Sequence, residues 1–356
     1  MKLFKCPCCG QLLHFENTSC VGCGRRLGYV PDPGILTALD PAPDGSAGRW
    51  LARAEIGGEY RFCDNADHEV CNWLVPADGG ETFCTACRHN QRVPDISNPQ
   101  NLTAWRRIEA AKHRLIYSLL QLGLPVPGPG EGSEPLVFQF LADATTPDAP
   151  KVMTGHDNGL VTIALAEADD VERERRRATM GEPYRTLIGH FRHEVGHFYW
   201  DLLVRDGGRL DACRAVFGDD SRDYGAALTR HYREGPPANW QEHFISSYAT
   251  THPWEDFAET WAHYLHIVDT LEMARAFGLS VAPRIENTDA LKATADLDVY
   301  AEPDMGKIVR TWVPLAFALN SLNRCMGQGD LYPFVLGPAV IRKLAFVHEL
   351  VREARK

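Results

Sequence analysis

The 356-residue sequence lacks any apolar run long enough to cross a bilayer, which needs about 20 residues in a helix. The most apolar late stretch, residues 309–322, is shorter than this and is interrupted by Pro314. At the N-terminus, MKLFKCPCCG reaches cysteines before an apolar leader segment could form. We therefore expect no membrane association and a cytoplasmic location.

Positive charge is also scarce. Lys and Arg number 37 against 47 Asp and Glu, which gives a formal net charge of -10. Such a surface repels the phosphates of nucleic acids, so nucleic acid is not an expected partner. Hydrophobic residues at 44% and charged residues at 24% are typical of globular proteins. The length predicts two or three domains with a sizeable core.

Cysteine is almost missing beyond residue 90, because nine of the 11 cysteines precede it. Two CxxC pairs make up the first module and supply four expected zinc ligands: Cys6, Cys9, Cys20 and Cys23. Gly10 and Gly24 follow these pairs and permit the tight turns that point backbone N–H groups at thiolates. Four thiolates complete a tetrahedral structural zinc site. Cys8 lies inside the first pair and is not expected to be a ligand.

The second cysteine module offers four more thiolates: Cys63, Cys71, Cys84 and Cys87. The last two have CxxC spacing, whereas the first two are further apart, so that His68 could replace one of them. We expect one or two structural Zn²⁺ ions, and a reducing compartment. A protein partner is a more natural target for these zinc modules than nucleic acid. The isolated Cys213 and Cys325 are expected to be core residues.

Apolar periodicity, prolines and glycines predict the order of elements. The predictions are an irregular linker at residues 31–48, a helix at 102–122, strands at 136–141 and 160–165, a helix at 184–205, a helix from Pro253 to about residue 274, and further helices after about residue 305.

The motif HFRHEVGHFYWD, residues 190–201, carries the strongest chemical signal. His193 and His197 stand one helical turn apart on the same face, so both imidazoles can reach one zinc ion. Glu194 lies beside the position left for water and would take its proton as a general base. Gly196 weakens a helix, but its missing side chain would let another segment approach closely.

A second motif, residues 248–259, follows downstream and places two glutamates on a separate predicted helix. Catalytic zinc sites usually have three protein ligands and one open position. Glu255 and Glu259 share a helix face, so one could bind the metal while the other orients a ligating histidine. Glu259, Asp256 and His263 are the alternatives to Glu255 as third ligand.

This arrangement resembles the gluzincin class of peptidases, and its motifs are similar to those of the anthrax lethal factor peptidase domain. The resemblance implies that Glu255 is the third ligand, that Glu259 supports a ligand, and that Tyr248 stabilises the oxyanion or assists the leaving group. Asp256 departs from the pattern, which has an aromatic residue there. The whole chain more closely resembles the bacterial family described as "putative zinc-binding metallopeptidases", with a zinc-ribbon front followed by HExxH.

The sequence therefore predicts an α+β protein. We expect a zinc ribbon at residues 1–30, a second cysteine-rich zinc module at 50–95, and a mainly helical, zincin-like metallopeptidase domain with a small β-sheet at 100–356. Its expected function is peptide-bond hydrolysis in peptides or proteins by a zinc-activated water, with one catalytic Zn²⁺. The alternative is a non-enzymatic zinc-ribbon adaptor that binds protein or nucleic acid and has a vestigial metal site.

Overall fold

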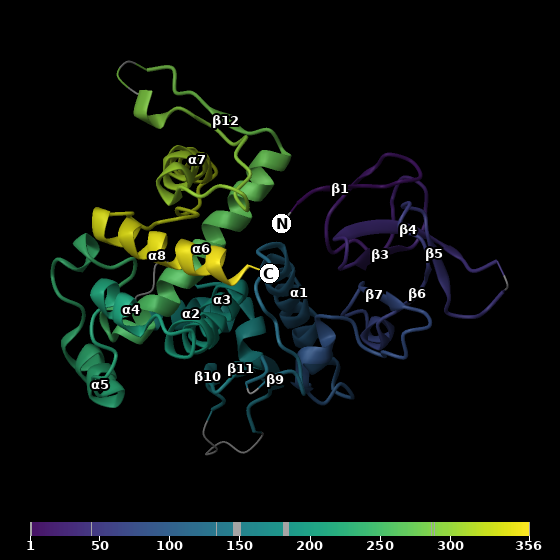
Figure 1. Ribbon diagram of the computed structural model, residues 1–356, viewed down its shortest axis with the longest axis horizontal. Coiled ribbons are helices and arrows are strands. Elements are labelled where there is room, and N and C mark those ends of the chain that lie inside the picture. Colours follow the sequence, from purple (N-terminus) through teal and green to yellow (C-terminus); the bar gives the residue numbers. More distant parts are fainter. Residues whose placement is uncertain are drawn as a thin grey trace. The chain divides into compact units, whose positions relative to one another are not determined.

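A computed structural model describes residues 2–43, 45–132, 134–144, 151–180, 185–285, 287 and 289–355. Its contacts divide the chain into two compact units, whose elements are labelled in Figure 1. The first comprises Met1–Tyr117, Val126–Gly155 and Gly159–Asp169, and the second comprises Ser118–Pro125, His156–Asn158 and Asp170–Lys356. The division into domains at residues 1–30, 50–95 and 100–356 stays a prediction.

The first unit begins with a hairpin of β1 (Phe4–Lys5) and β2 (Leu12–Leu13). A five-stranded antiparallel sheet follows, in which each strand pairs with the next along the chain: β3 (Leu27–Val30), β4 (Ile35–Pro41), β5 (Trp50–Ala52), β6 (Glu59–Phe62) and β7 (Leu74–Pro76). A parallel bridge between Tyr29 and Trp73 joins the two ends of this sheet. The sheet is therefore curled almost into a closed barrel.

The irregular linker predicted at residues 31–48 is wrong, because β4 occupies the middle of it. Four consecutive residues of β4 are buried, and Leu39 packs against Val30 and Leu74. Pro31 and Pro33 lie in the turn before the strand, and Pro41 is its last residue, where proline is tolerated. Proline content suggested a linker, but these prolines mark the ends of a strand.

The remaining elements of the first unit surround the second cysteine module: η1 (Asp64–His68), η2 (Cys87–His89), β8 (Asn90–Arg92), β9 (Val137–Leu141), β11 (Leu160–Ala164) and η3 (Leu165–Ala168). β9 pairs in parallel with both β8 and β11. The strands predicted at 136–141 and 160–165 are therefore confirmed as β9 and β11. The helix predicted at 102–122 is confirmed as α1 (Pro99–Gln121), which belongs to the first unit up to Tyr117.

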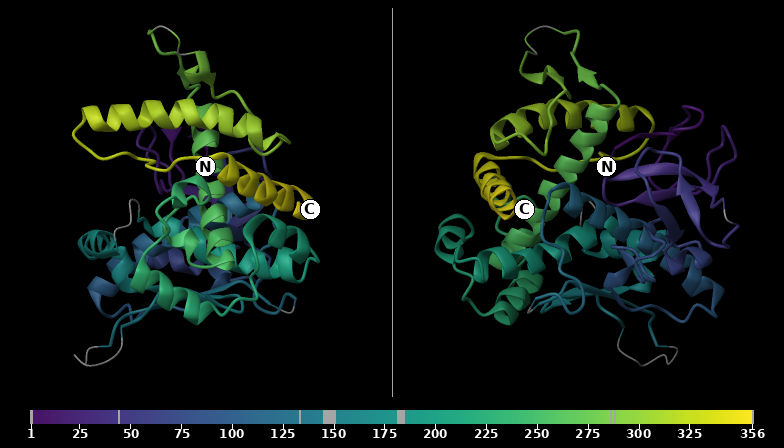
Figure 2. Two further views of the ribbon diagram at one scale, coloured as in Figure 1. Left: turned by 90° about the vertical axis from the view of Figure 1, so that its left-hand side faces the viewer. Right: turned by 45° about the vertical axis from the view of Figure 1, so that its right-hand side comes forward.

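The second unit is mainly helical. Strand β10 (Gly155–Asp157) leads into it, and its other elements follow in chain order: α2 (Asp170–Met180), α3 (Leu187–Tyr199), the π-helix η4 (Trp200–Arg205), α4 (Leu210–Phe217), α5 (Tyr224–Glu234), η5 (Trp240–Glu242), η6 (Tyr248–Thr250), α6 (Pro253–Ala276), β12 (Ser280–Val281), η7 (Asp289–Leu291), β13 (Ala293–Thr294), α7 (Met305–Cys325) and α8 (Pro338–Ala354). Figure 2 shows the long helix α6 in green, with the yellow α8 against it.

The helix predicted at 184–205 begins at Leu187, after Thr186 caps it by accepting a hydrogen bond from the Gly189 amide. Residue 184 lies outside the described residues. From Trp200 to Arg205 the helix continues in the wider π form. The helix predicted from Pro253 is confirmed as α6, with proline in its first turn.

Helices α3 and α6 form the centre of the second unit, and a glycine sets their separation. A Cβ atom on Gly196 would lie 2.9 Å from the Cα of Ala258, closer than real Cβ contacts allow. One helical turn away, Tyr199 stacks on Trp261 with ring centroids 4.7 Å apart. The close approach expected from Gly196 is thus present, and it brings the HExxH helix against the helix that carries Glu255.

Two buried ion pairs hold α6 in position. Arg192 on α3 pairs with Asp269 at 2.5 Å, and Lys343 on α8 pairs with Asp256 at 2.6 Å. The Asp256 pair joins α6 to α8 beside Glu255, and the Asp269 pair joins α6 to α3 further along the helix. Because an unpaired charge in such surroundings would be strongly unfavourable, each pair fixes the relative position of its helices.

Among the described residues, none of the helices has both the length and the apolarity needed to span a bilayer. Cys213 is buried, as expected, but Cys325 is exposed at the end of α7, so its assignment to the core is wrong. Spacing alone did not show that the last turn of α7 faces solvent.

Candidate active site and thiolate metal sites

Three ligand atoms from α3 and α6 form a small triangle. Nε2 of His193 lies 3.2 Å from Nε2 of His197, and Oε2 of Glu255 lies 3.0 Å from the first and 3.5 Å from the second. A tetrahedral zinc ion bound at 2.0–2.1 Å separates its nitrogen and oxygen ligands by about 3.3 Å. The three distances bracket this value, so the side chains are spaced to share one ion.

The electrostatics of the triangle also favour a cation. Glu255 is only 2% exposed, and its Oε2 atom is turned towards the two histidine nitrogens. Although burial opposes the shift, Glu255 and Glu259 raise the pKa of His193 well above its usual value. The site therefore attracts positive charge to the position between the three atoms.

Glu259 lies behind His193 and orients it. Its Oε1 atom is 2.7 Å from Nδ1 of His193, and its Oε2 atom accepts a 2.5 Å hydrogen bond from Ser246. The Ser246 hydroxyl is itself held by the Ala249 amide at 3.1 Å. A proton on Nδ1 leaves Nε2 free to bind a metal, which is the usual arrangement of a supported histidine ligand.

Glu255 is held by a tyrosine that sequence reasoning missed. The hydroxyl of Tyr224 donates a 2.7 Å hydrogen bond to Oε1 of Glu255, on the oxygen that does not face the histidines. Tyr224 is the first residue of α5, after Asp223 caps the helix through the Ala226 amide. It lies 31 residues before Glu255, and no motif connects the two.

Tyr248 lies near both Tyr224 and His193. Its ring centroid is 6.0 Å from that of His193, and its hydroxyl interacts with that of Tyr224. Burial and the charge of Glu255 raise the pKa of Tyr248, so its hydroxyl remains protonated and can donate a hydrogen bond. This is the state required of a group that stabilises an oxyanion.

Glu194 is 8% exposed and follows His193 directly on α3. Burial raises the pKa of Glu194 to about 7; the charges of Glu255 and Glu259 act in the same direction, and His193 opposes them. A carboxylate with such a pKa exchanges protons readily near neutral pH. It therefore has the property expected of a general base.

His197 is covered by two aromatic residues that the sequence did not single out. Trp254 packs against its ring at a tilt of 33°, with centroids 3.7 Å apart, and the ring centroid of His156 lies 6.1 Å away. Burial and the nearby His197 and Arg205 lower the pKa of His156 to about 3, so this histidine is neutral. The position of Trp254, directly before Glu255, could have indicated its place beside the metal site.

The alternatives to Glu255 as third ligand have other partners. Asp256 is fully buried against Lys343, and Nδ1 of His263 lies 3.0 Å from the Tyr332 hydroxyl. In the described part of the chain, the group that surrounds this position consists of His193, His197 and Glu255.

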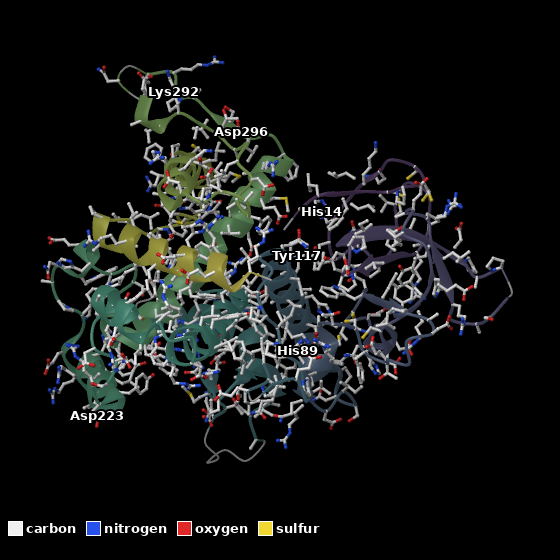
Figure 3. The ribbon with its side chains drawn as sticks, viewed as in Figure 1. His14, His89, Tyr117, Asp223, Lys292 and Asp296 are labelled. Atoms are coloured by element: carbon white, nitrogen blue, oxygen red, sulfur yellow. The ribbon has the colours of Figure 1, made fainter. Side chains whose placement is uncertain are left out.

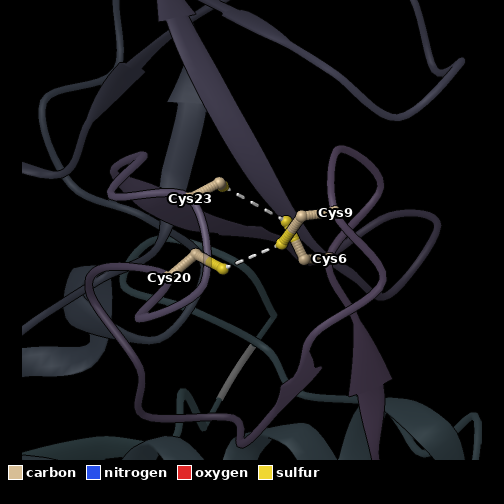
Figure 4. A group of neighbouring side chains, drawn as sticks. All are labelled: Cys6, Cys9, Cys20 and Cys23. Carbon is tan, nitrogen blue, oxygen red and sulfur yellow. Dashed lines mark hydrogen bonds between the residues drawn. The ribbon is translucent and has the colours of Figure 1, made fainter.

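The first cysteine module brings four sulfur atoms together (Figure 4). Cys6 and Cys23 are 3.8 Å apart, Cys9 and Cys20 are 3.6 Å apart, and all four sulfurs lie within 4.8 Å of one another: Cys6, Cys9, Cys20 and Cys23. Zinc–sulfur bonds of 2.3 Å give tetrahedral edges of about 3.8 Å. Gly10 and Gly24 have φ values of 77° and 71°, which only glycine adopts freely. Cys8 stands outside the group.

The second module gathers four buried cysteines whose sulfurs also lie within 4.8 Å of one another: Cys63, Cys71, Cys84 and Cys87. Nε2 of His113, on α1, lies 3.3 Å from the sulfur of Cys71. Neighbouring thiols and the charge of buried Lys112 hold the pKa of Cys87 well below its usual value. His68, the expected alternative ligand, lies beside Trp105 instead, with ring centroids 6.1 Å apart.

Two family models match the chain. The model of a zinc-ribbon domain covers residues 3–98, and the model described as "putative zinc-binding metallo-peptidase" covers residues 101–350. Together they confirm the predicted order of a zinc-ribbon front and a peptidase domain, and the mixture of helices and small sheets confirms the α+β class.

The chain is also similar to curated bacterial proteins. It is 42% identical to an uncharacterised protein of Mycobacterium bovis and to an uncharacterised protein of Mycobacterium tuberculosis. Each comparison covers 99% of this chain and 96% of the relative. No solved structure matches, so the likeness to the anthrax lethal factor peptidase domain remains an expectation from motifs. The long match to the peptidase model, joined to the zinc-ribbon match, shows that the chain belongs to the family described as "putative zinc-binding metallo-peptidase".

Proposed function

We propose that the chain hydrolyses peptide bonds and that His193, His197 and Glu255 hold its catalytic zinc. The observation that carries the proposal is the triangle of three ligand atoms, 3.0–3.5 Å apart. Glu194 stands beside this triangle on the same helix. A zinc ion held there would lower the pKa of a bound water and polarise the carbonyl of the substrate.

The residues around the triangle then have distinct tasks. Glu194 takes the proton from the attacking water and passes it to the leaving amine. Its pKa of about 7 suits both steps, because a group with a pKa near the working pH can accept and release a proton. Tyr248 donates a hydrogen bond to the oxygen on which negative charge develops. Glu259 keeps Nε2 of His193 turned towards the triangle through its 2.7 Å contact with Nδ1.

We further propose that each cysteine group binds one structural zinc: Cys6, Cys9, Cys20 and Cys23 in the first, and Cys63, Cys71, Cys84 and Cys87 in the second. Neither sulfur group leaves a position for water, as expected of structural sites. These ions would stabilise the first unit by holding together the turns that carry the cysteines. The surface of this zinc-ribbon region is the proposed contact for a protein partner.

The test combines zinc content with cleavage of a proteome-derived peptide library. The purified protein should contain three zinc ions, of which one is released by a chelator that leaves the thiolate sites intact. Glu194→Gln should keep all three ions but lose roughly 10²–10⁴-fold in hydrolysis, the range for a general base. Glu242→Gln, an exposed acid on η5, is the matched control and should behave as wild type.

Equal hydrolysis by wild type and Glu194→Gln would contradict the mechanism. A zinc-loaded protein that cleaves no peptide, and whose Glu194→Gln variant retains its cellular function, would favour the adaptor alternative.

A further inference from the structure

A cavity of about 600 Å³ lies in the second unit between α5 and the segment that follows Tyr248. Its walls include Arg222, Arg230 and His231 on one side and Thr251 on the other. Figure 3 labels Asp223, which marks the beginning of α5. α5 contains no fully buried residue, so this wall is open to a ligand from solvent.

The cavity adjoins the candidate active site through Tyr248. The ring of His231, which lines the cavity, has its centroid 6.1 Å from that of Tyr248. The ring of Tyr248 is in turn 6.0 Å from that of His193. An extended peptide advances about 3.3 Å per residue. A peptide held at the zinc position can therefore place a side chain in the cavity within about four residues of the scissile bond.

The acidic residues of the cavity are already engaged. The Asp223 carboxylate caps α5 by accepting a 2.7 Å hydrogen bond from the Ala226 amide. Glu234 pairs with Arg233 at 2.5 Å. Each of these carboxylates therefore has a partner other than Arg222 and Arg230.

The two arginines, in contrast, are available. Neither Arg222 nor Arg230 has an ion pair with a carboxylate within the described part of the chain. Asp219, whose charge interacts with Arg222, accepts hydrogen bonds from the amide and hydroxyl of Ser221. Both guanidinium groups line the cavity, although the protein as a whole has a formal net charge of -10.

A buried hydroxyl adds a further polar group. Thr251 is 6% exposed, it lines the cavity, and its Oγ1 atom has no hydrogen-bond partner in the described residues. A buried polar group without a partner is unfavourable, so a ligand that accepts its hydrogen bond is favoured. Burial lowers the pKa of His231, so the positive charge of the cavity comes from the arginines.

We propose that this cavity binds a carboxylate of the substrate, and that the enzyme therefore prefers peptides with an acidic residue within about four positions of the cleaved bond. Arg222 and Arg230 supply the charge, and Thr251 supplies a hydrogen bond. The proposal rests on the proposed function and specifies its substrate class. The carboxylate could belong to an Asp or Glu side chain or to the C-terminus of the peptide, and the test separates these two sources.

The first measurement uses binding, which does not depend on hydrolysis. Zinc-loaded Glu194→Gln protein selects ligands from two random decapeptide libraries, one amidated and one with free C-termini. We expect Glu194→Gln to enrich Asp and Glu from the amidated library. A triple variant with Glu194→Gln, Arg222→Gln and Arg230→Gln should lose this enrichment. Enrichment only among free C-termini would assign the cavity to the terminal carboxylate instead. Equal enrichment with and without the arginines would overturn the proposal.

The second measurement uses cleavage by the wild-type holoenzyme. The Arg222→Gln and Arg230→Gln double variant should lose roughly tenfold in kcat/KM for an acidic peptide, the effect of two ion pairs in a solvent-accessible site. It should cleave the matching Asn or Gln peptide as wild type does. Arg230→Glu should shift the preference towards Lys and Arg. Arg310→Gln is the matched control, because this exposed arginine pairs with Asp304 and does not line the cavity.

The two proposals fail in different ways. Cleavage of peptides without any acidic preference would contradict the cavity assignment and leave the peptidase intact. Selection of acidic peptides by a protein that cleaves none of them would contradict the peptidase and leave the carboxylate site intact.

Discussion

Tyr224 donates a 2.7 Å hydrogen bond to Oε1 of Glu255, while Oε2 of the same carboxylate faces His193 at 3.0 Å. The tyrosine therefore fixes which oxygen of Glu255 points to the proposed metal position. Residues that orient a ligand typically contribute 10–100-fold to metal affinity.

Tyr224→Phe should lower the affinity for the catalytic zinc by roughly tenfold, because the carboxylate can then rotate. Competition with a fluorescent chelator measures this affinity. Tyr264→Phe is the control, since the hydroxyl of this tyrosine lies 3.0 Å from Nδ1 of His348 rather than at the metal site. An unchanged zinc affinity in Tyr224→Phe would show that Glu255 does not need this hydrogen bond.

Glu259→Gln and Asp256→Asn should have different effects, although the two residues are three positions apart on α6. Glu259→Gln weakens the support of His193, so zinc affinity should fall by roughly 10–100-fold. Asp256→Asn leaves Lys343 without its buried partner, so the free energy of unfolding should fall by about 3–5 kcal/mol. Chelator competition and urea unfolding separate the two. A zinc affinity that falls more in Asp256→Asn would contradict the ligand assignment.

Gly196→Ala should disturb the packing of α3 against α6. Its new Cβ would lie 2.9 Å from the Cα of Ala258, so the helices must move apart. We expect a loss of about 1–3 kcal/mol in the free energy of unfolding, with weaker zinc binding because the ligands lie on both helices. Gly225→Ala on α5 is the control, because its Cβ would meet nothing closer than 3.5 Å. Unfolding by urea that is unchanged in Gly196→Ala would contradict this packing.

His263 should make the protein less stable in acid. Burial lowers the pKa of His263 to about 4, whereas the unfolded chain binds this proton below about pH 6.5. The stabilisation from a neutral His263 is therefore complete above pH 6.5 and is lost as the pH falls towards 4, by at most about 3 kcal/mol. Urea unfolding of wild type and His263→Gln at pH 7 and pH 4.5 measures it. The difference between the two proteins should shrink in acid, since other titrating groups affect both; a constant difference would contradict this prediction.

The sequence predicted the elements of the site that depend on short spacings. An i and i+4 pair of histidines defines one helix face, and an acidic motif beginning after Pro253 defines another. The contact between these helices was indicated by Gly196, because glycine within a helix is otherwise unfavourable. CxxC pairs likewise predicted the sulfur groups, since two residues between cysteines leave little freedom in the turn.

The parts that the sequence did not predict depend on contacts between distant segments. Tyr224, His156 and His113 reach their places through tertiary packing, and no local pattern distinguishes them from other aromatic residues. The curled sheet was missed because β4 is buried over four consecutive residues and therefore shows no alternation. Prolines at both ends of the strand made the same segment look irregular.

The absence of any fully buried residue in α5 has a consequence for how proteins of this family can diversify. The two helices that carry the proposed metal ligands approach closely at Gly196, so a change there is expected to disturb both folding and the site. α5 lies between them in the chain, and most of its residues can be exchanged without opening the core. Related proteins could therefore change their substrate specificity through substitutions on α5 while the residues of the proposed metal site stay the same.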